Sequence, residues 1–371
     1  MSLRRCALEA PDGIGEARGA RRHPCRREAW YDHGPPAVSL APELRLDLAA
    51  TTTAICERLR DQLATQLQRR GLVIAMSGGV DSSVCAALAA RAVGADRVFG
   101  LLLPERESDA ESLPLARSWA EALGLEFVAE DIGPILDAFG CYWRRNEAVR
   151  RVVPEFDDGW RCKVVLPGSP MDSERLNVPY LVVEFPDGTL HRARLPAAEY
   201  RQIVAATSFK QRTRKVLEYY HADRLHYAVL GTPNRLEYDQ GFFVKGGDGL
   251  ADVKPIAHLY KGQVYALAEY LGVPSAIRDR TPTTDTYSLP QTQEEFYFAL
   301  PTETLDLVLF AHNRGRECAL VAGELGYEGD AVARAFLDID RKRAATRYLH
   351  LPPLLAGPVP EVQSPVAAEQ D

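Results

Sequence analysis

The stretch Leu72-Val73-Ile74-Ala75-Met76-Ser77-Gly78-Gly79-Val80-Asp81-Ser82-Ser83 decides the fold of this chain. Its first half is a short apolar run, which predicts a buried parallel strand, and the small and apolar residues at 84–93 predict a helix. A Ser-Gly-Gly turn joins the two. A strand, a glycine turn and a helix N-terminus bring unpaired backbone N–H groups and the positive end of a helix dipole to one point. This arrangement favours an anion such as phosphate at the turn.

The side chains around the turn indicate nucleotide phosphates together with a divalent cation. The two glycines permit unusual φ angles and keep side chains away from the anion. The hydroxyls of Ser77, Ser82 and Ser83 can donate further hydrogen bonds, whereas Asp81 would repel a phosphate unless a cation lies between them. The Walker pattern does not apply, because it needs a Lys after the second Gly. A helix N-terminus beside a glycine pair, without a ligand, is the structural alternative.

Composition restricts the class of protein. The chain has 371 residues, of which 46% are hydrophobic and 26% charged, as in soluble globular proteins, and its net charge of −7 argues against general affinity for nucleic acid. No apolar run approaches the roughly 20 residues of a membrane-spanning helix, and no secretory signal is present. The seven cysteines include no Cys-x-x-Cys pair, which predicts reduced thiols in a cytoplasmic protein without a zinc site.

Strand and helix signals alternate along much of the chain. We expect strands at 98–103, 126–129 and 226–230 with helices between them, which predicts an α/β fold with a doubly wound, Rossmann-like parallel sheet. An amphipathic helix within 44–70 precedes the first strand and either covers the core or forms a dimer face.

Three segments depart from this pattern. Residues 1–42 are rich in Arg, Gly and Pro and residues 351–371 in Pro, so we expect both to be disordered tails. Residues 150–206 predict an inserted β-hairpin subdomain, because two strand-like runs and a Pro-Asp-Gly turn occur there. Residues 43–149 and 207–350 then form one nucleotide-binding domain. The insertion is surface decoration, a cap over the site or a subunit contact, and the sequence leaves these alternatives open.

Polar motifs follow the last predicted strand. Thr232 comes at its end and Glu237 five residues later. In open α/β sheets this edge faces the ligand crevice, so the hydroxyl and the carboxylate are expected to share one site. The glycine-rich stretch 241–252, with Lys245 and Asp252, is too polar for a core and indicates a functional loop.

Seven blocks in this order resemble the ammonia-dependent NAD synthetases, a family of PP-loop ATP pyrophosphatases. The blocks are SGGVDSS at 77–83, Lys210-x-Arg212-x-Arg214, GTPNRLE at 231–237, GFFVKGGDGLAD at 241–252, Lys254-Pro255-Ile256 leading to Lys261, PTTD at 282–285, and Arg341-Lys342-Arg343. Their order and spacing match the family over residues 55–345, apart from the insertion.

The resemblance implies an AMP-forming carbon–nitrogen ligase. The carboxylate of deamido-NAD would attack the α-phosphate of ATP, giving an acyl-adenylate and pyrophosphate, and ammonia would then displace AMP to give NAD. This chemistry needs in-line positioning and neutralisation of triphosphate charge, for which Mg²⁺ is the expected cofactor. The alternative is the same chemistry on another carboxylic acid. A tRNA-thiolating relative would need paired catalytic cysteines, and a catalytically dead nucleotide sensor would not need the metal ligands.

The resemblance also implies roles for individual residues. ATP would contact Ala75, Met76, Ser77, Gly78, Gly79, Val80, Asp81, Ser82, Thr232, Lys261 and Thr283. Mg²⁺ would be bound by Asp81 and Glu237, and catalysis would involve Asp81, Lys261 and Thr283. Deamido-NAD would contact Arg212, Lys245, Asp252, Arg341 and Lys342. Structural alternatives exist: a solvated helix face for Arg212, loop ordering for Lys245 and Asp252, a helix N-cap for Thr283, and a surface basic run for Arg341 and Lys342.

The family suggests partners as well. Its members are typically homodimers with the dinucleotide site at the interface, so we expect a homodimer in which the helix at 48–67 contributes to the interface. Glutamine-dependent members carry an additional amidohydrolase-type domain, for which the segment before residue 43 is too short, so we expect free ammonia or a separate glutaminase subunit as the nitrogen source. The chain departs from the family at Ser208, where an Asn is usual, and around Gln293-Glu294. The ATP side of the site is therefore better preserved than the acceptor side.

Overall fold

The computed structural model describes residues 42–359 except 167, 170, 172–177 and 284–285. Apart from Pro42, the predicted N-terminal tail lies outside the described residues, as do residues 360–371 of the C-terminal tail. The described part of that tail, 351–359, contains no helix or strand. Among the described residues, no helix combines the length and the apolar character that crossing a membrane requires.

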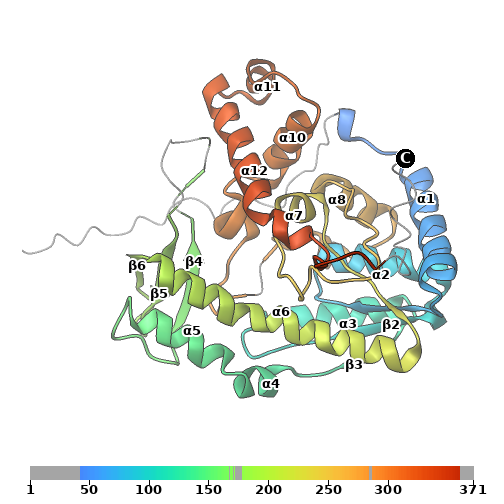
Figure 1. Ribbon diagram of the computed structural model, residues 1–371, viewed down its shortest axis with the longest axis horizontal. Helices are drawn as coiled ribbons and strands as arrows, with labels where there is room; N and C mark the ends of the chain where they lie inside the picture. The colour runs from blue at the N-terminus through green and yellow to red at the C-terminus, as the bar shows by residue number, and fades with distance from the viewer. Residues whose placement is uncertain (1–41, 167, 170, 172–177, 284–285, 360–371) are drawn as a thin grey trace, which may run out of the picture. The chain divides into compact units, whose positions relative to one another are not determined.

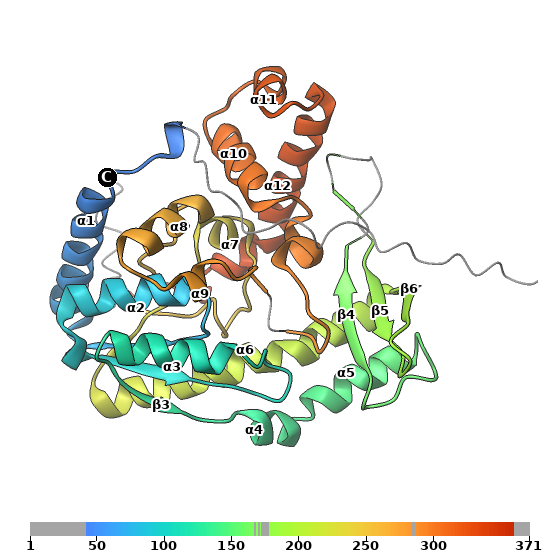
Figure 2. The ribbon, with the colours of Figure 1, turned by 180° about the vertical axis from the view of Figure 1, so that it is seen from behind.

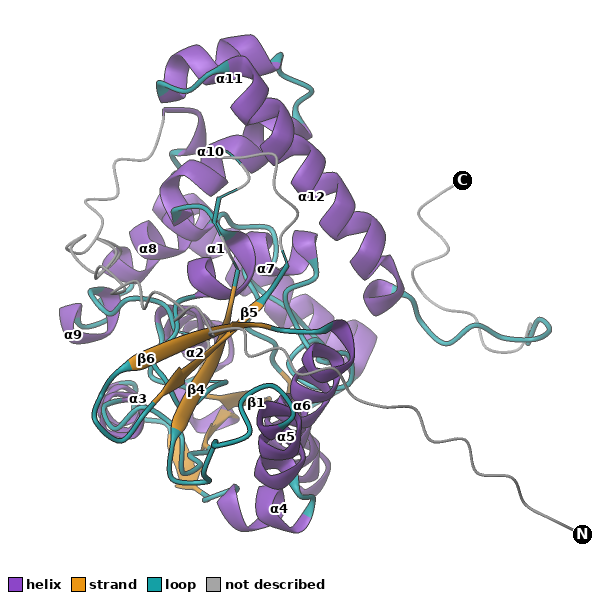
Figure 3. Ribbon diagram, turned by 90° about the vertical axis from the view of Figure 1, so that its left-hand side faces the viewer, coloured by secondary structure: helices purple, strands orange, loops and turns teal. Residues whose placement is uncertain are grey.

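A four-stranded parallel sheet forms the centre of the fold, with strand order β3-β2-β1-β7. The strands are β1 (Leu72–Ala75), β2 (Val98–Leu102), β3 (Glu126–Ala129) and β7 (Ala228–Val229). In Figure 3, β1 lies below the helices α10, α11 and α12. The α/β class and the parallel sheet predicted from the sequence are confirmed.

Helices cover both faces of this sheet, because successive strand residues point to opposite sides. On one side, Leu72, Ile74 and Leu102 pack in one apolar cluster with α1 (Leu48–Asp61), α2 (Val80–Val93) and α8 (Lys261–Tyr270). On the other side, Val73, Phe99 and Leu101 pack with α6 (Ala197–Leu225). In Figure 1 α6 lies in front of the sheet, and in Figure 2, seen from behind, α2 and α3 lie in front. The sheet is therefore doubly wound.

The remaining described helices connect these layers and form a C-terminal helical part. They are η1 (Pro42–Leu44), η2 (Gln62–Leu67), η3 (Ala95–Arg97), α3 (Ser112–Ala122), α4 (Gly133–Ala138), α5 (Cys141–Arg150), α7 (Arg235–Gln240), α9 (Ser275–Arg278), η4 (Glu294–Phe298), α10 (Thr302–Asn313), α11 (Cys318–Leu325) and α12 (Gly329–His350).

Helix α6 is longer than the sequence indicates. We expected a helix between the insertion and the strand at 226–230, but α6 begins at Ala197 and crosses the predicted domain boundary at residues 206 and 207. Several of its buried positions carry charged side chains that are paired, as in the Lys215–Glu218 ion pair of 2.7 Å with both side chains 5% exposed. These charged positions lie in the predicted part of the helix, whereas the additional N-terminal turns bury Ile203, which packs in the apolar core of the insertion. The prediction left these turns out because it assigned residues 150–206 to the β insertion. The domain division itself stays a prediction.

The predicted hairpin in the insertion is present. Strands β4 (Arg161–Val165), β5 (Tyr180–Glu184) and β6 (Leu190–Arg194) form an antiparallel sheet in the order β4-β5-β6. Gly188 adopts a φ of +79° in the turn, which favours glycine. One face of this sheet builds a separate apolar core that includes Leu181 and Val183.

Candidate active site

The turn after β1 is shaped by hydrogen bonds among its own serines. The hydroxyl of Ser82 donates to the carbonyl of Gly79 (3.0 Å) and accepts from the amide of Ser77 (3.3 Å), while the two hydroxyls lie 3.2 Å apart. Gly78 has a φ of +76°, and a Cβ at this position would lie 2.5 Å from the carbonyl oxygen of Ser112. The turn therefore needs glycine for both its backbone angle and its close contact with α3.

An ion pair connects the N-terminal turns of two helices. Asp81 lies in the first turn of α2, and its carboxylate accepts from the ammonium of Lys261, the first residue of α8. The side chains are 18% and 2% exposed, respectively. Asn234 donates a further bond of 3.1 Å to Asp81. Burial alone would lower the pKa of Lys261, but the charge of Asp81 outweighs it and raises the pKa, so Lys261 stays cationic.

Glu237 brings a second carboxylate to the same place. It belongs to α7, where its side chain accepts from the amide of Asn234 (3.1 Å) and from the side-chain amide of Gln293 (2.9 Å). Desolvation and the nearby charge of Asp81 raise the pKa of Glu237 to about 7, although Lys261 opposes the shift. A cation between the two carboxylates would remove this repulsion.

Asp81 and Glu237 fit a hard divalent cation, because carboxylate oxygens are the ligands that such ions prefer. No group of three or more His, Cys, Asp or Glu with metal-binding geometry occurs in the part of the chain that the structure describes. The two carboxylates therefore suit an ion whose other ligands are substrate phosphates and water, as is usual for Mg²⁺.

A cleft of about 600 Å³ collects these groups. The predicted ATP and metal residues that line it are Ala75, Met76, Ser77, Gly79, Val80, Asp81, Ser82, Thr232, Glu237, Lys261 and Thr283. Gly78 is not among the lining residues, since it faces α3. These residues come from separate segments of the chain, and the tertiary structure brings them to the carboxyl end of the parallel strands, as expected for this fold class.

Asp306 of α10 binds the start of α8, the helix that carries Lys261, although no sequence motif marks Asp306. Its carboxylate is 2% exposed and accepts from the backbone amides of Lys261 (3.1 Å) and Gly262 (2.7 Å), which open α8. Desolvation raises the pKa of Asp306 to about 7, with partial compensation by these two hydrogen bonds. Asp306 thus fixes the helix end that carries Lys261.

Lys210, the first residue of the predicted basic helix motif, forms buried ion pairs within the protein. Its ammonium donates to Glu105 (2.7 Å) and Glu107 (2.8 Å), which follow β2. Burial would raise the pKa of Glu107, but its bonds to Arg145 and Lys210 lower it to about 2. This buried network fixes the loop after β2 against α6, beside the cleft that Glu105 and Lys210 line.

Three of the predicted acceptor residues lie together outside the cleft. Arg212 of α6 donates to the carbonyl of Lys245 (3.3 Å), and Asp252 accepts from Tyr219 of the same helix (3.2 Å). Arg212, Lys245 and Asp252 are exposed, so they form a polar surface along the outer side of α6.

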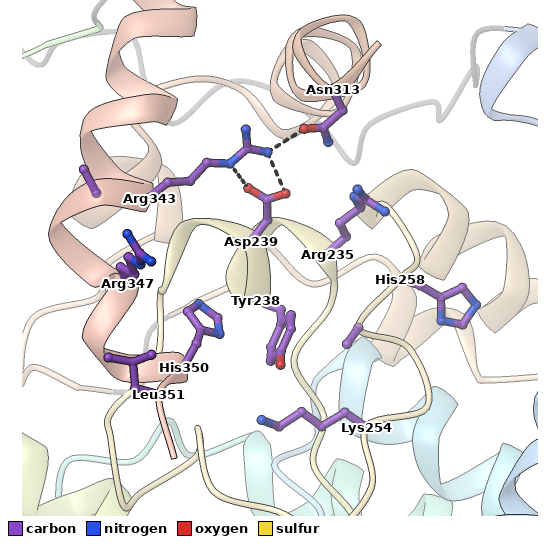
Figure 4. Close-up of a pocket in the computed structure, with 12 residues that line it drawn as sticks. Arg235, Tyr238, Asp239, Lys254, His258, Asn313, Arg343, Arg347, His350 and Leu351 are labelled. Carbon is purple, nitrogen blue, oxygen red and sulfur yellow. Dashed lines mark hydrogen bonds and ion pairs between the residues drawn. The ribbon is translucent and has the colours of Figure 1, made fainter. Parts of the chain in front are cut away.

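The basic cluster 341–343 lies within α12, and its three side chains diverge. Arg341 is exposed, whereas Lys342 forms an ion pair of 2.7 Å with Asp338, and burial lowers the pKa of Lys342. Arg343 binds both oxygens of Asp239 (2.6 and 2.8 Å) in a second, open hollow of about 1030 Å³ on the outer side of α7 (Figure 4). Neither Arg341 nor Lys342 is among the residues that line either hollow. Their role in acceptor binding stays a prediction.

Comparison with known proteins places these features in one family. The sequence pattern of the family described as NAD synthase matches residues 51–153 and 174–344. The chain is 59% identical over 316 residues to a Rhizobium rhizogenes protein named NH(3)-dependent NAD(+) synthetase, covering 85% of this chain and 95% of that one. It is 57% identical over 330 residues to the protein of that name from Rhizobium meliloti, covering 88% and 97%.

Solved structures share the fold. NMN synthetase from Francisella tularensis superposes with a TM-score of 0.58 at 22% identity, covering 84% of this chain and 99% of that one. NH3-dependent NAD synthetase from Campylobacter jejuni superposes with a TM-score of 0.55 at 21% identity, covering 84% and 100%.

Gly78→Ala tests the close contact in the turn. We expect ATP to bind about tenfold more weakly, because the strained φ and the contact with Ser112 together cost on the order of 1–3 kcal/mol at the binding loop. Gly188→Ala is the matched control, since its φ is also positive but no atom lies within 4 Å of a Cβ there. Calorimetric titration with ATP measures both variants. Equal ATP affinity of Gly78→Ala and wild type would contradict this account of the turn.

Asp306→Asn tests the buried carboxylate through pH. The pKa of Asp306 is about 7 in the folded state and about 4 in an unfolded chain. Between these values the folded state binds the additional proton, so this group makes wild type lose stability as pH rises, by roughly 1.4 kcal/mol per pKa unit. Asn has no such proton. The stability of Asp306→Asn relative to wild type should therefore increase between about pH 4 and 7.

Urea unfolding at several pH values measures this difference. Asp330→Asn is the control, because Asp330 is an exposed carboxylate in the first turn of α12. A stability difference between wild type and Asp306→Asn that does not change with pH would show that the Asp306 pKa is not raised.

Proposed function

Since the chain belongs to the NAD synthase family, we propose that it is an ammonia-dependent NAD synthetase. It adenylates the carboxylate of deamido-NAD with ATP, and ammonia then displaces AMP to give NAD. The main support is the cleft at the end of the parallel strands, where nearly all the predicted ATP and metal residues meet. The two Rhizobium relatives, which match over almost their whole length, carry this activity in their names.

The geometry of the cleft supports the ATP half of the proposed reaction. The triphosphate binds at the N-terminus of α2, where backbone N–H groups of the turn and the helix dipole favour negative charge. Lys261 lies at the N-terminus of α8 and supplies a fixed positive charge toward the same point. Asp81 and Glu237 would hold Mg²⁺, which would supply positive charge to neutralise the triphosphate. Thr232 and Thr283 contribute hydroxyl groups to the cleft wall.

The acceptor half uses the surface on α6. Arg212, Lys245 and Asp252 bind deamido-NAD there, with Arg341 and Lys342 as further contacts. Arg212, Lys245 and Asp252 lie together outside the cleft, which supports a binding site completed by a second subunit.

Two apolar side chains support a homodimer that contains this surface. Val216 and Tyr220 are 67% and 59% exposed, and they follow Arg212 at intervals of four residues on α6. Residues at this spacing share one helix face, so an apolar stripe continues the polar acceptor surface.

The nitrogen source in this proposal is free ammonia, and a separate glutaminase subunit is the alternative supply. A cytoplasmic location agrees with the thiols of Cys56, Cys85, Cys141, Cys162 and Cys318, which are all unpaired.

A coupled assay with ATP, Mg²⁺ and ammonium tests the proposal. We expect one NAD, one AMP and one pyrophosphate per turnover with deamido-NAD, and much slower turnover with nicotinate mononucleotide. Pyrophosphate release that depends on another acid, with no NAD formed from deamido-NAD, would refute the proposed acceptor.

Arg212→Ala tests the acceptor site in the same assay. Loss of a charged contact should raise the KM for deamido-NAD about tenfold and leave the KM for ATP unchanged. Arg201→Ala is the control, because Arg201 is an exposed arginine on the same helix, away from this surface. Unchanged kinetics of Arg212→Ala would remove Arg212 from the site.

Tyr220→Arg tests the homodimer. Placing a charge in the centre of the apolar stripe should convert a dimer to a monomer at micromolar concentration, as measured by light scattering. Tyr270→Arg is the control, because Tyr270 is 42% exposed at the end of α8, outside the stripe. Wild-type protein that is already monomeric would contradict the proposed interface.

A further inference from the structure

The segment 286–298 forms one wall of the candidate active site. Thr286, Gln293, Phe296 and Tyr297 line the cleft, and Gln293 donates to Glu237 at 2.9 Å. The orientation of a carboxylate that is proposed to bind the cation therefore depends on where this segment lies.

The inserted sheet holds the segment through its free edge. Strand β4 pairs with β5 on one side, and its other edge faces the segment, which runs beside it in Figure 2. Such an edge has unpaired N–H and C=O groups that need partners. Cys162 forms two of the connecting hydrogen bonds: its amide donates to the hydroxyl of Ser288 (2.9 Å), and its carbonyl accepts from the amide of Leu289 (3.2 Å). Further along the strand, the side chain of Gln291 donates to the carbonyl of Val164. The amide of Leu166 donates to the carbonyl of Glu295 (2.9 Å).

Lys163 makes the charged contact at the centre of this edge. Its side chain is 8% exposed, and its ammonium donates to the carbonyl of Pro290 (3.1 Å) and to the carboxylate of Glu295 (2.9 Å). Glu295 also closes a turn, because its amide donates to the hydroxyl of Thr292 (3.0 Å). Gln293 lies inside that turn. Lys163 therefore contacts residues on both sides of Gln293, Pro290 before it and Glu295 after it.

Apolar packing anchors the same segment to the insertion. Tyr287 is 4% exposed and belongs to the insertion's apolar core. The ring centroids of Tyr287 and Phe296 lie 5.5 Å apart. The insertion thus contacts the cleft wall by hydrogen bonds, an ion pair and aromatic packing.

Strand β4 is also outside the part of the chain that the family pattern matches, since the match leaves out residues 154–173. The connection from β4 to the cleft is therefore a feature of this chain that the family pattern does not include.

We propose that Lys163 is a positioning residue for the active site, which acts through the turn at 292–295 and Gln293 on Glu237. The inserted sheet is then a support for the cleft wall rather than surface decoration. The contacts come from the structure alone, while the identity of the bound nucleotide as ATP with Mg²⁺ rests on the proposed function.

Lys163→Met tests this, because Met keeps the unbranched apolar stem and removes the ammonium. Calorimetric titration with ATP in excess Mg²⁺ should give a Kd raised about tenfold, as expected for the loss of a hydrogen bond to a charged group. Lys163→Arg should restore most of the affinity. Arg161→Met is the matched control, since Arg161 is on the same strand but its exposed side chain pairs with Glu184 within the sheet.

A double mutant separates positioning from general stability. Gln293→Leu alone should raise the Kd, and adding Lys163→Met should then change the Kd by less than twofold. A lower melting temperature of Lys163→Met with an unchanged Kd would overturn the proposal, and so would fully additive effects on the Kd. If Lys163→Met does not fold, Ser288→Ala replaces it in the same titration. Ser288→Ala should raise the Kd about threefold in the wild-type background and leave it unchanged in the Gln293→Leu background.

The binding readout also distinguishes this inference from the proposed function. Wild-type protein that binds ATP with Mg²⁺ but forms no NAD would contradict the function and leave the comparison of Kd values intact. Normal NAD formation together with an unchanged Kd for Lys163→Met would contradict only the role of Lys163.

Discussion

The ion pair between Asp81 and Lys261 is the interaction on which the rest of the site depends. It joins the first turns of α2 and α8, so two positive helix ends and a cationic side chain converge on one point. Such a concentration of positive potential is costly without an anion, and Asp81 provides one in this structure. The proposed substrate is a more highly charged anion, which explains why these helix ends face an open cleft and not the core.

Buried charge recurs around this centre, and each instance is compensated by a specific partner. Asp306 accepts two backbone amides at the start of α8, and Lys210 bridges two glutamates beside α6. Unpaired, such groups would cost several kcal/mol each. Paired, they fix the relative positions of helices that carry site residues. The positions of the residues in the candidate site therefore depend on buried ion pairs and hydrogen bonds outside the cleft as well as on the residues that line it.

Sequence reasoning predicted the residues that line the cleft and missed much of their support. Local motifs carry the predicted phosphate-binding residues, because the strand–turn–helix geometry is encoded in adjacent residues. Asp306 and Lys163 escaped notice because each acts on a residue far away in the chain, and no local pattern marks a buried partner. The N-terminal half of α6 was likewise missed, since its buried Ile203 packs against the insertion, to which the sequence analysis assigned residues 150–206.

The sequence by itself determined the fold class, the strand–turn–helix at 72–93 and the inserted hairpin, because periodicity, glycine positions and turn residues act over short distances. Only the tertiary structure decided which distant groups meet. It placed Glu237 beside Asp81, separated the acceptor residues from the cleft, and set the insertion against the segment that carries Gln293. These outcomes depend on packing and on the compensation of buried charge, which involve partners more than a hundred residues apart.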